Sequence, residues 1–282
     1  MKIAGVQMDV SIGSVDANVE KMISLLTNTS SQGAALTIFP ECAATGYCFE
    51  SLEEARPFAE PIPGPITNRM ADACRDSGGF AVFGMLESAG ESVFNAAVLT
   101  GPHGIVASYR KVHLPFLGAD AFTTYGDRPF AVHEAGELRI GLNICYDSAF
   151  PESSRALAIL GADLIVLPTN WPPGAECVAR HTIATRAMEN AVYYAAINRV
   201  GTERGFTFIG QSSICAPNGE TLAAANATDE QILYAEIDPE KARNKRAVRV
   251  PGKHAIDRMA DRRPEMYGLL TKPHNLPRPG RE

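Results

Sequence analysis

Short apolar runs of strand character alternate with amphipathic helical segments along this chain, and this alternation limits the folds that it can adopt. Residues 2–10 are predicted to form a strand, residues 16–29 an amphipathic helix, and residues 36–40 a second strand. Further strands are predicted at 80–86, 95–100, 104–109, 138–144, 163–168, 191–198, 210–216 and 232–236, and further helices at 66–76, 152–160 and 177–190. So many strands with a few covering helices predict a layered α/β sandwich rather than a helical bundle or an all-β barrel.

The length and composition of the chain fit one folded unit. Its 282 residues, 45% hydrophobic and 21% charged, can bury a large core. We expect a single domain over residues 1–282, with a Pro-rich, basic arm from about residue 239 to residue 282. Within the arm, residues 241–249 are interpreted as a solvated stretch or a subunit contact.

Charge, hydropathy and cysteine spacing exclude several classes of function. The formal net charge of −6 makes nucleic acid an unexpected partner. The sequence has neither an apolar run of membrane-spanning length nor a signal-peptide pattern at its start, so we expect no membrane association and a cytoplasmic location. The six cysteines form no CxxC pair and no zinc-type spacing, which predicts free thiols and no metal site.

One cysteine ends a predicted strand, in the segment Gly141-Leu-Asn-Ile-Cys145-Tyr-Asp147. Strand ends that precede a helix are where α/β enzymes place reactive groups. Backbone N–H groups of the following turn are expected to lower the pKa of the thiol and to favour the nucleophilic thiolate. A small hydrophobic residue of the core is an equally compatible interpretation of this segment.

Two charged residues follow other predicted strands. Glu41 comes directly after residues 36–40, where partial desolvation would raise its pKa and suit it to act as a general base. Lys111 ends the strand-like segment Ser108-Tyr-Arg-Lys111, where its ammonium could stabilise a thiolate and an oxyanion. Taken singly, a solvated Glu and a surface Lys on an edge strand are the simpler interpretations.

Together, the three segments resemble the nitrilase, or carbon-nitrogen hydrolase, superfamily in its amidase-like branch. In that family a Glu follows a Phe-Pro-like pair, a Lys lies in Tyr-Arg-Lys-x-His-Leu, and a Cys lies in Gly-x-x-x-Cys-Tyr-Asp with Phe-Pro-Glu after it. This chain has all three segments in the same order and at comparable spacing. Further similar segments begin at Gly161, Arg186, Asn198 and Gly210, so the resemblance spans nearly the whole chain.

The resemblance implies a four-layer αββα sandwich that assembles into homodimers or larger even-numbered homo-oligomers and uses no cofactor. It gives Glu41 the role of base, Lys111 the stabilisation of the oxyanion and Cys145 the role of nucleophile. The backbone N–H of Tyr146 would be the second oxyanion donor. Many members carry a second Glu in the loop after the Lys, and Asp120 is placed at that position here, with a solvated loop Asp as the competing interpretation.

The resemblance also implies a small-molecule amide as substrate. Nitrile-hydrolysing members commonly have Trp-Glu after the nucleophile, whereas amide-hydrolysing members often have Tyr-Asp, as at Tyr146-Asp147. The implied reaction converts a small aliphatic or ω-amino amide to a carboxylate and ammonia through a Cys thioester. Hydrolysis of an N-carbamoyl amine or a nitrile is the alternative within the family, and a catalytically idle scaffold subunit is the alternative of a different class. The expected substrate-binding side chains are Tyr47, Phe116, Phe122, Asn170 and Trp171, and Glu152 and Arg155 are expected to form a structural ion pair.

Overall fold

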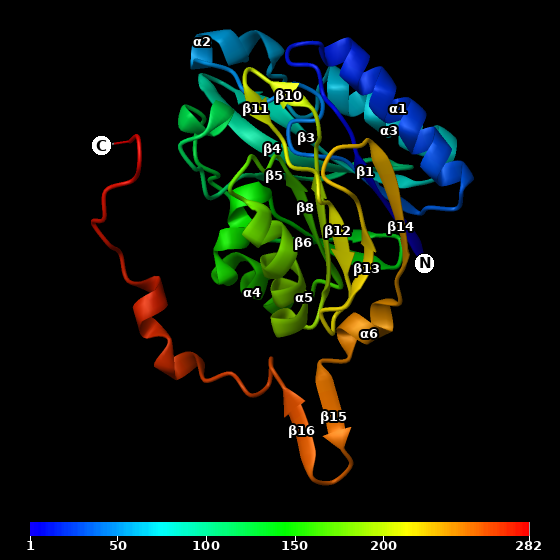
Figure 1. Cartoon of the computed structure of the whole chain (residues 1–282), viewed down its shortest axis with the longest axis vertical. Helices are drawn as coiled ribbons and strands as arrows, with labels where there is room; N and C mark the ends of the chain where they lie inside the picture. The colour runs from blue at the N-terminus through cyan, green and yellow to red at the C-terminus, as the bar shows by residue number, and fades with distance from the viewer. Residues whose placement is uncertain (282) are drawn as a thin grey trace.

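Two six-stranded β-sheets lie face to face in the computed structural model, which describes residues 1–281 (Figure 1). The first sheet contains, in spatial order, β14 (Gln231–Glu236), β1 (Lys2–Gln7), β2 (Leu36–Ile38), β3 (Phe80–Ala89), β4 (Ser92–Gly101) and β5 (Gly104–Arg110). The second contains β13 (Thr221–Ala224), β12 (Ser213–Cys215), β9 (Tyr193–Asn198), β8 (Leu164–Thr169), β7 (Leu138–Leu142) and β6 (Val132–Ala135). Strands β1 to β3 are parallel to one another, as are β7 to β9, so the carboxyl ends of these neighbours meet at one edge of each sheet.

Helices cover the outer face of each sheet. The long helices are α1 (Val15–Ser31) and α3 (Pro65–Ser77) on the first sheet, and α4 (Pro151–Ile159) and α5 (Ile183–Asn190) on the second (Figure 1). Side chains of β3 alternate between the two sides of their sheet: Val82 belongs to the cluster between the sheets, while Phe83 belongs to the cluster that contains Met22 of α1 and Met70 of α3. The arrangement confirms the expected four-layer αββα sandwich.

Several short elements were not expected from the sequence. The predicted helix 177–190 consists of a π-helical turn (Val178–Thr182) followed by α5. Strands β6 and β13 were missed because they are short edge strands, and β13 is mostly exposed, so neither has the long apolar run of a central strand. The other additions are α2 (Leu52–Ala55), β10 (Thr202–Glu203), β11 (Phe206–Thr207), and the 3₁₀ turns Arg56–Phe58, Gly118–Ala121 and Cys145–Ala149.

The C-terminal segment leaves the sandwich after β14. It contains α6 (Pro239–Arg243), a hairpin of β15 (Arg246–Val250) and β16 (His254–Asp257), and the 3₁₀ turns Pro264–Met266 and Gly268–Thr271. The hairpin protrudes from one end of the molecule, and the chain then runs back along its side (Figure 1). Near its end, Arg281 donates hydrogen bonds to the backbone carbonyls of Asp120 (2.6 Å) and Thr123 (3.0 Å). Among residues 1–281, no helix combines the length and the apolar character that a membrane span requires.

Candidate active site

The three residues with expected catalytic roles follow strands of both sheets. Glu41 lies shortly after β2 and Lys111 directly after β5, both in the first sheet, whereas Cys145 lies shortly after β7 in the second. Their exposed fractions are 0%, 1% and 6%, respectively. The simpler interpretations of Glu41 as a solvated strand end and of Lys111 as a surface residue are therefore wrong, although β5 is an edge strand.

A buried cluster of charges surrounds the Lys111 ammonium. Its Nζ lies 2.6 Å from Glu41 Oε1 and 2.5 Å from Asp120 Oδ2. Asp120 is fully buried and also accepts a hydrogen bond of 2.8 Å from the Tyr47 hydroxyl, so it is not a solvated loop residue. Burial works to lower the pKa of Lys111, but the charges of Asp120 and Glu41 together raise it well above its ordinary value. The lysine therefore stays an ammonium.

The two oxygens of Glu41 have different surroundings. Oε1 accepts hydrogen bonds from Lys111 and, at 2.7 Å, from Asn95 Nδ2. Oε2 is buried, and no hydrogen-bond partner for it exists within residues 1–281. Burial raises the pKa of this carboxyl above its ordinary value, although Lys111 opposes the shift. A carboxylate with one free oxygen and a raised pKa is suited to accept a proton.

The backbone at Cys145 is held in an uncommon conformation. Its φ of 43° lies in the left-handed region, which is strained for a residue with a Cβ. Asp147 stabilises this turn, because its Oδ2 accepts a hydrogen bond of 2.9 Å from the N–H of Ile144. Ser148 Oγ adds a hydrogen bond of 2.8 Å to the carbonyl of Cys145. The turn thus fixes the cysteine at the end of its strand.

The expectation that the turn lowers the pKa of the Cys145 thiol is wrong. Burial and then the charge of Glu41 raise this pKa to about 12, outweighing the opposing effects of Lys111, Thr169 and Asn170. Desolvation disfavours the thiolate more than nearby donors favour it. The thiol is therefore neutral near pH 7, and it needs a base at the moment that it reacts.

A second hydrogen-bond network connects the segment after β5 to the cysteine turn. Asp147, fully buried, accepts a hydrogen bond of 2.8 Å from the Tyr109 hydroxyl, and its Oδ1 lies 2.7 Å from His113 Nδ1. The His113 ring stacks on Phe150 with centroids 3.8 Å apart. These residues belong to the segments around Lys111 and Cys145 that the sequence singled out, and their contacts with each other were not foreseen.

The expected substrate-binding side chains are only partly brought together. Asn170 is fully buried beside Cys145, and both polar atoms of its side chain lack partners in the described part of the chain. Trp171 is buried in the same core cluster as Cys145, and the hydroxyl of Tyr47 is already bound to Asp120. Phe116 lies at the surface with 62% of its area exposed.

Two further residues were expected near the site, Phe122 through its ring and Tyr146 through its backbone N–H. Phe122 is half-buried and packs in the cluster that contains Tyr47. The N–H of Tyr146 lies in the first turn of the 3₁₀ helix Cys145–Ala149, where backbone donors have no partner within the helix. Its side chain is 40% exposed and packs edge-on against the ring of Phe150.

Asn95 is the functional candidate that sequence analysis missed. It is fully buried in β4 and donates hydrogen bonds to Glu41 Oε1 and, at 2.8 Å, to Asp120 Oδ1. The available signal was its position, since it is the one polar residue in the apolar run 93–99. No group of three or more metal-ligating side chains occurs in residues 1–281.

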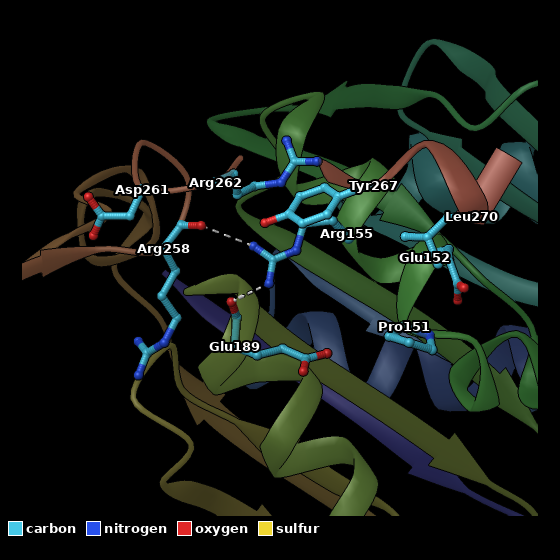
Figure 2. Close-up of a pocket in the computed structure, with 9 residues that line it drawn as sticks. All are labelled: Pro151, Glu152, Arg155, Glu189, Arg258, Asp261, Arg262, Tyr267 and Leu270. Atoms are coloured by element: carbon cyan, nitrogen blue, oxygen red, sulfur yellow. Dashed lines mark hydrogen bonds between the residues drawn. The ribbon is translucent and has the colours of Figure 1, made fainter. Parts of the chain in front are cut away.

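A groove of about 450 Å³ lies away from these residues, between α4 and the C-terminal segment (Figure 2). It does not include Cys145. The ion pair expected between Glu152 and Arg155 is not among the salt bridges of residues 1–281. Arg155 instead donates to the backbone carbonyls of Glu189 (2.8 Å) and Arg258 (3.5 Å), as the dashed lines in Figure 2 mark. The Arg155 guanidinium therefore connects α4 to α5 and to the C-terminal segment through backbone carbonyls, without an ion pair to Glu152.

Comparisons with known proteins show the family of this chain. Residues 2–247 match the carbon-nitrogen hydrolase family. The chain is 41% identical to a nitrilase of Pyrococcus abyssi over 95% of this chain and 99% of that one. It is 30% identical to an omega-amidase of Homo sapiens over 85% of this chain and 89% of that one.

A solved structure extends the similarity to three dimensions. The E41Q mutant of the amidase from Nesterenkonia sp. AN1 is 26% identical, covers 94% of this chain and 95% of its own, and superposes with a TM-score of 0.77. That structure shows covalent addition of the acetamide moiety of fluoroacetamide at the active site cysteine. The family match, the relatives and the shared fold lead to one conclusion: this chain belongs to the carbon-nitrogen hydrolase family and is a hydrolase of the nitrilase and amidase type.

Proposed function

We propose that this protein hydrolyses the C–N bond of a small aliphatic or ω-amino amide, releasing a carboxylate and ammonia through a thioester on Cys145. The observation that carries the proposal is the unpartnered Oε2 of Glu41 near Cys145, whose thiol is kept neutral because burial, and then the charge of Glu41, raise its pKa. A neutral thiol, a nearby base with a free oxygen and a fixed ammonium are the groups that nucleophilic acyl transfer requires.

In the acylation step, Glu41 accepts the Cys145 proton while Sγ attacks the amide carbon. The resulting oxyanion is held by Lys111 and by the backbone N–H of Tyr146. An ammonium has three donors, and Lys111 uses one for Glu41 and one for Asp120, which leaves one for the oxyanion. Protonated Glu41 then returns its proton to the leaving nitrogen, and the C–N bond breaks.

In the deacylation step, the same carboxylate accepts a proton from water. The hydroxide that forms attacks the thioester carbon, Lys111 and Tyr146 again hold the oxyanion, and the Cys145 sulfur leaves with the proton from Glu41. This cycle consumes one water and regenerates the enzyme. Each proton transfer uses the free Oε2, since Oε1 is occupied by Lys111 and Asn95.

The surroundings of the thiol favour an amide over a nitrile. Asn170 presents a buried donor and a buried acceptor without partners, and Glu41 Oε2 is a further free acceptor. A primary amide supplies two N–H donors and a carbonyl acceptor that could satisfy these groups, whereas a nitrile supplies an acceptor alone. The Tyr146-Asp147 pair supports the same choice. We propose that Asn170 and Trp171 contact the substrate directly, with Tyr47 acting through Asp120.

Assembly is proposed on the resemblance, the single domain on the length and composition of the chain, and the location on its free thiols. We propose a single domain with a C-terminal arm, an even-numbered homo-oligomer and a cytoplasmic location. Light scattering of the purified protein tests the assembly, because a mass of one subunit would contradict it.

Ammonia release from a matched panel tests the proposed reaction. The panel contains an aliphatic amide, an ω-amino amide, a ureido compound and the nitrile of the same chain length. The expected result is fastest release from an amide, with an acyl adduct on the Cys145 peptide when the reaction is quenched and digested. Cys145→Ala and Cys145→Ser should remain folded and inactive, whereas Cys177→Ala, which changes an exposed thiol, should remain active.

The alternatives give different results in the same experiment. Preferred cleavage of the ureido compound or the nitrile would reassign the substrate class within the family. No release from any compound, together with slow and unselective labelling of all six thiols by iodoacetamide, would indicate a catalytically idle scaffold.

A further inference from the structure

The buried cluster carries more negative than positive charge. Glu41 and Asp120 are both fully buried and share the single ammonium of Lys111. Two carboxylates in one buried site repel each other and tend to bind a proton between them. A base that is already protonated cannot accept the proton of a thiol, so the cluster needs a further source of stabilisation.

Asn95 supplies this stabilisation without adding charge. Its Nδ2 donates one hydrogen bond to Glu41 Oε1 at 2.7 Å and one to Asp120 Oδ1 at 2.8 Å. A carboxamide has two N–H donors, so both are used on the two carboxylates. Asn95 and Lys111 thus bridge the same pair of carboxylates from two sides.

The orientation of the Asn95 amide is fixed by its other contact. Its Oδ1 accepts a hydrogen bond of 3.6 Å from the Cys42 thiol. Burial, followed by the charge of Glu41, raises the pKa of Cys42 well above its ordinary value, so this thiol remains protonated and can only donate to the amide oxygen. A rotated amide would direct its oxygen at two carboxylates and lose both donors.

We propose that Asn95 is a positioning residue that occupies Glu41 Oε1 and thereby reserves Oε2 for the Cys145 proton. The inference rests on the proposed role of Glu41 as base. A purely structural buried Asn would stabilise the fold without affecting how Glu41 titrates. If Asn95 bridges the carboxylates, its loss should also change the titration of Glu41, because removing the two donors makes Glu41 harder to ionise.

The test measures the rate of Cys145 alkylation by iodoacetamide as a function of pH, which needs no amide turnover. Asn95→Leu removes both donors at similar volume, and Asn95→Ser serves if the leucine variant does not fold. The matched control is Asn190→Leu, since Asn190 is also fully buried but donates to the backbone carbonyl of Arg186. Each variant is also made in the Glu41→Gln background.

We expect the acidic midpoint of the alkylation profile to move up by about one pH unit in the Asn95 variants. The midpoint should not move in Asn190→Leu, and the shift should vanish in the Glu41→Gln background. An unchanged midpoint in a folded Asn95 variant would overturn the proposal, as would a shift that persists without the Glu41 carboxylate. If the unmodified protein releases no ammonia but the shift is seen, the proposed function fails while the role of Asn95 stands.

Discussion

Gly84 is the position at which a single methyl group should disturb the proposed base most directly. A Cβ added there would lie 2.2 Å from the backbone N of Cys42 and 2.6 Å from Glu41 Cα. Ordinary contacts of a Cβ begin at 3.4 Å, so the 2.2 Å contact is 1.2 Å too short. Both obstructing atoms are backbone, which cannot rotate away as a side chain can.

We therefore expect Gly84→Ala to displace the Glu41 backbone by about 1 Å. A misplacement of this size can reduce the rate by roughly 100-fold even where the chemistry is untouched. Overpacking of a core of this kind also costs about 1–3 kcal/mol of stability. Both kcat for ammonia release and the rate constant for Cys145 alkylation should fall.

The control is Gly101→Ala in the neighbouring strand. Its Cβ would lie 2.5 Å from the ring of Phe80, a side chain that is not part of the charge cluster and that can move more easily than backbone. Gly101→Ala should lower the melting temperature without a comparable change in kcat. Wild-type kcat in a folded Gly84→Ala protein would refute the claim that the backbone at Glu41 is fixed this tightly.

Three further predictions concern the charged groups. Lys111→Met keeps the apolar stem but removes the ammonium, and it should cost about 3 kcal/mol or more of transition-state stabilisation, read as kcat; a change in KM alone would contradict this role. Because burial raises the pKa of Glu41 above its ordinary value of 4.5, kcat/KM should fall as the pH is lowered through that raised pKa, and an acidic limb retained in Glu41→Gln would assign the titration to another group. Asp163→Asn should destabilise the fold by about 2 kcal/mol at pH 7, because it weakens the contacts of a buried carboxylate with Arg139 and Arg243 at 3.0 and 2.9 Å. Burial alone would raise the pKa of Asp163, but the hydrogen bonds from these arginines lower it below its ordinary value of 3.8. The stabilisation by the Asp163 carboxylate is therefore present above pH 3.8 and is lost as the pH falls through the lowered pKa. The free energies of unfolding of the wild-type and Asp163→Asn proteins, measured by denaturation, should converge at low pH.

The strands that carry the candidate site could be predicted because each is an apolar run with a reactive residue at its end. The endings at Glu41, Lys111 and Cys145 are visible in the sequence, and their order and spacing led to the family that the comparisons then showed. Short edge strands such as β6 and β13 could not be predicted, since they bury little apolar surface and their pairing depends on strands distant in sequence.

The electrostatics of the site were predicted less well. The pKa of Cys145 was expected to fall, because a sequence shows the donors of a turn but not the depth at which the turn is buried. The contacts of Asn95 were missed for a related reason, since two carboxylates approach it from segments 54 and 25 residues away in the chain. Tertiary proximity of this kind has no local pattern.

The proposed nucleophile and the proposed base belong to different sheets, and the layer between those sheets is largely apolar, although hydrogen bonds such as the one from Tyr109 to Asp147 also cross it. Ladders of backbone hydrogen bonds fix the strands within each sheet, whereas Val82 of β3 and Val166 of β8 lie in the apolar cluster between the sheets. A small slip of one sheet over the other would separate the thiol from the carboxylate and leave every strand ladder intact. Turnover should therefore report a shift between the sheets before circular dichroism does. On heating, enzymatic activity should be lost at a lower temperature than secondary structure.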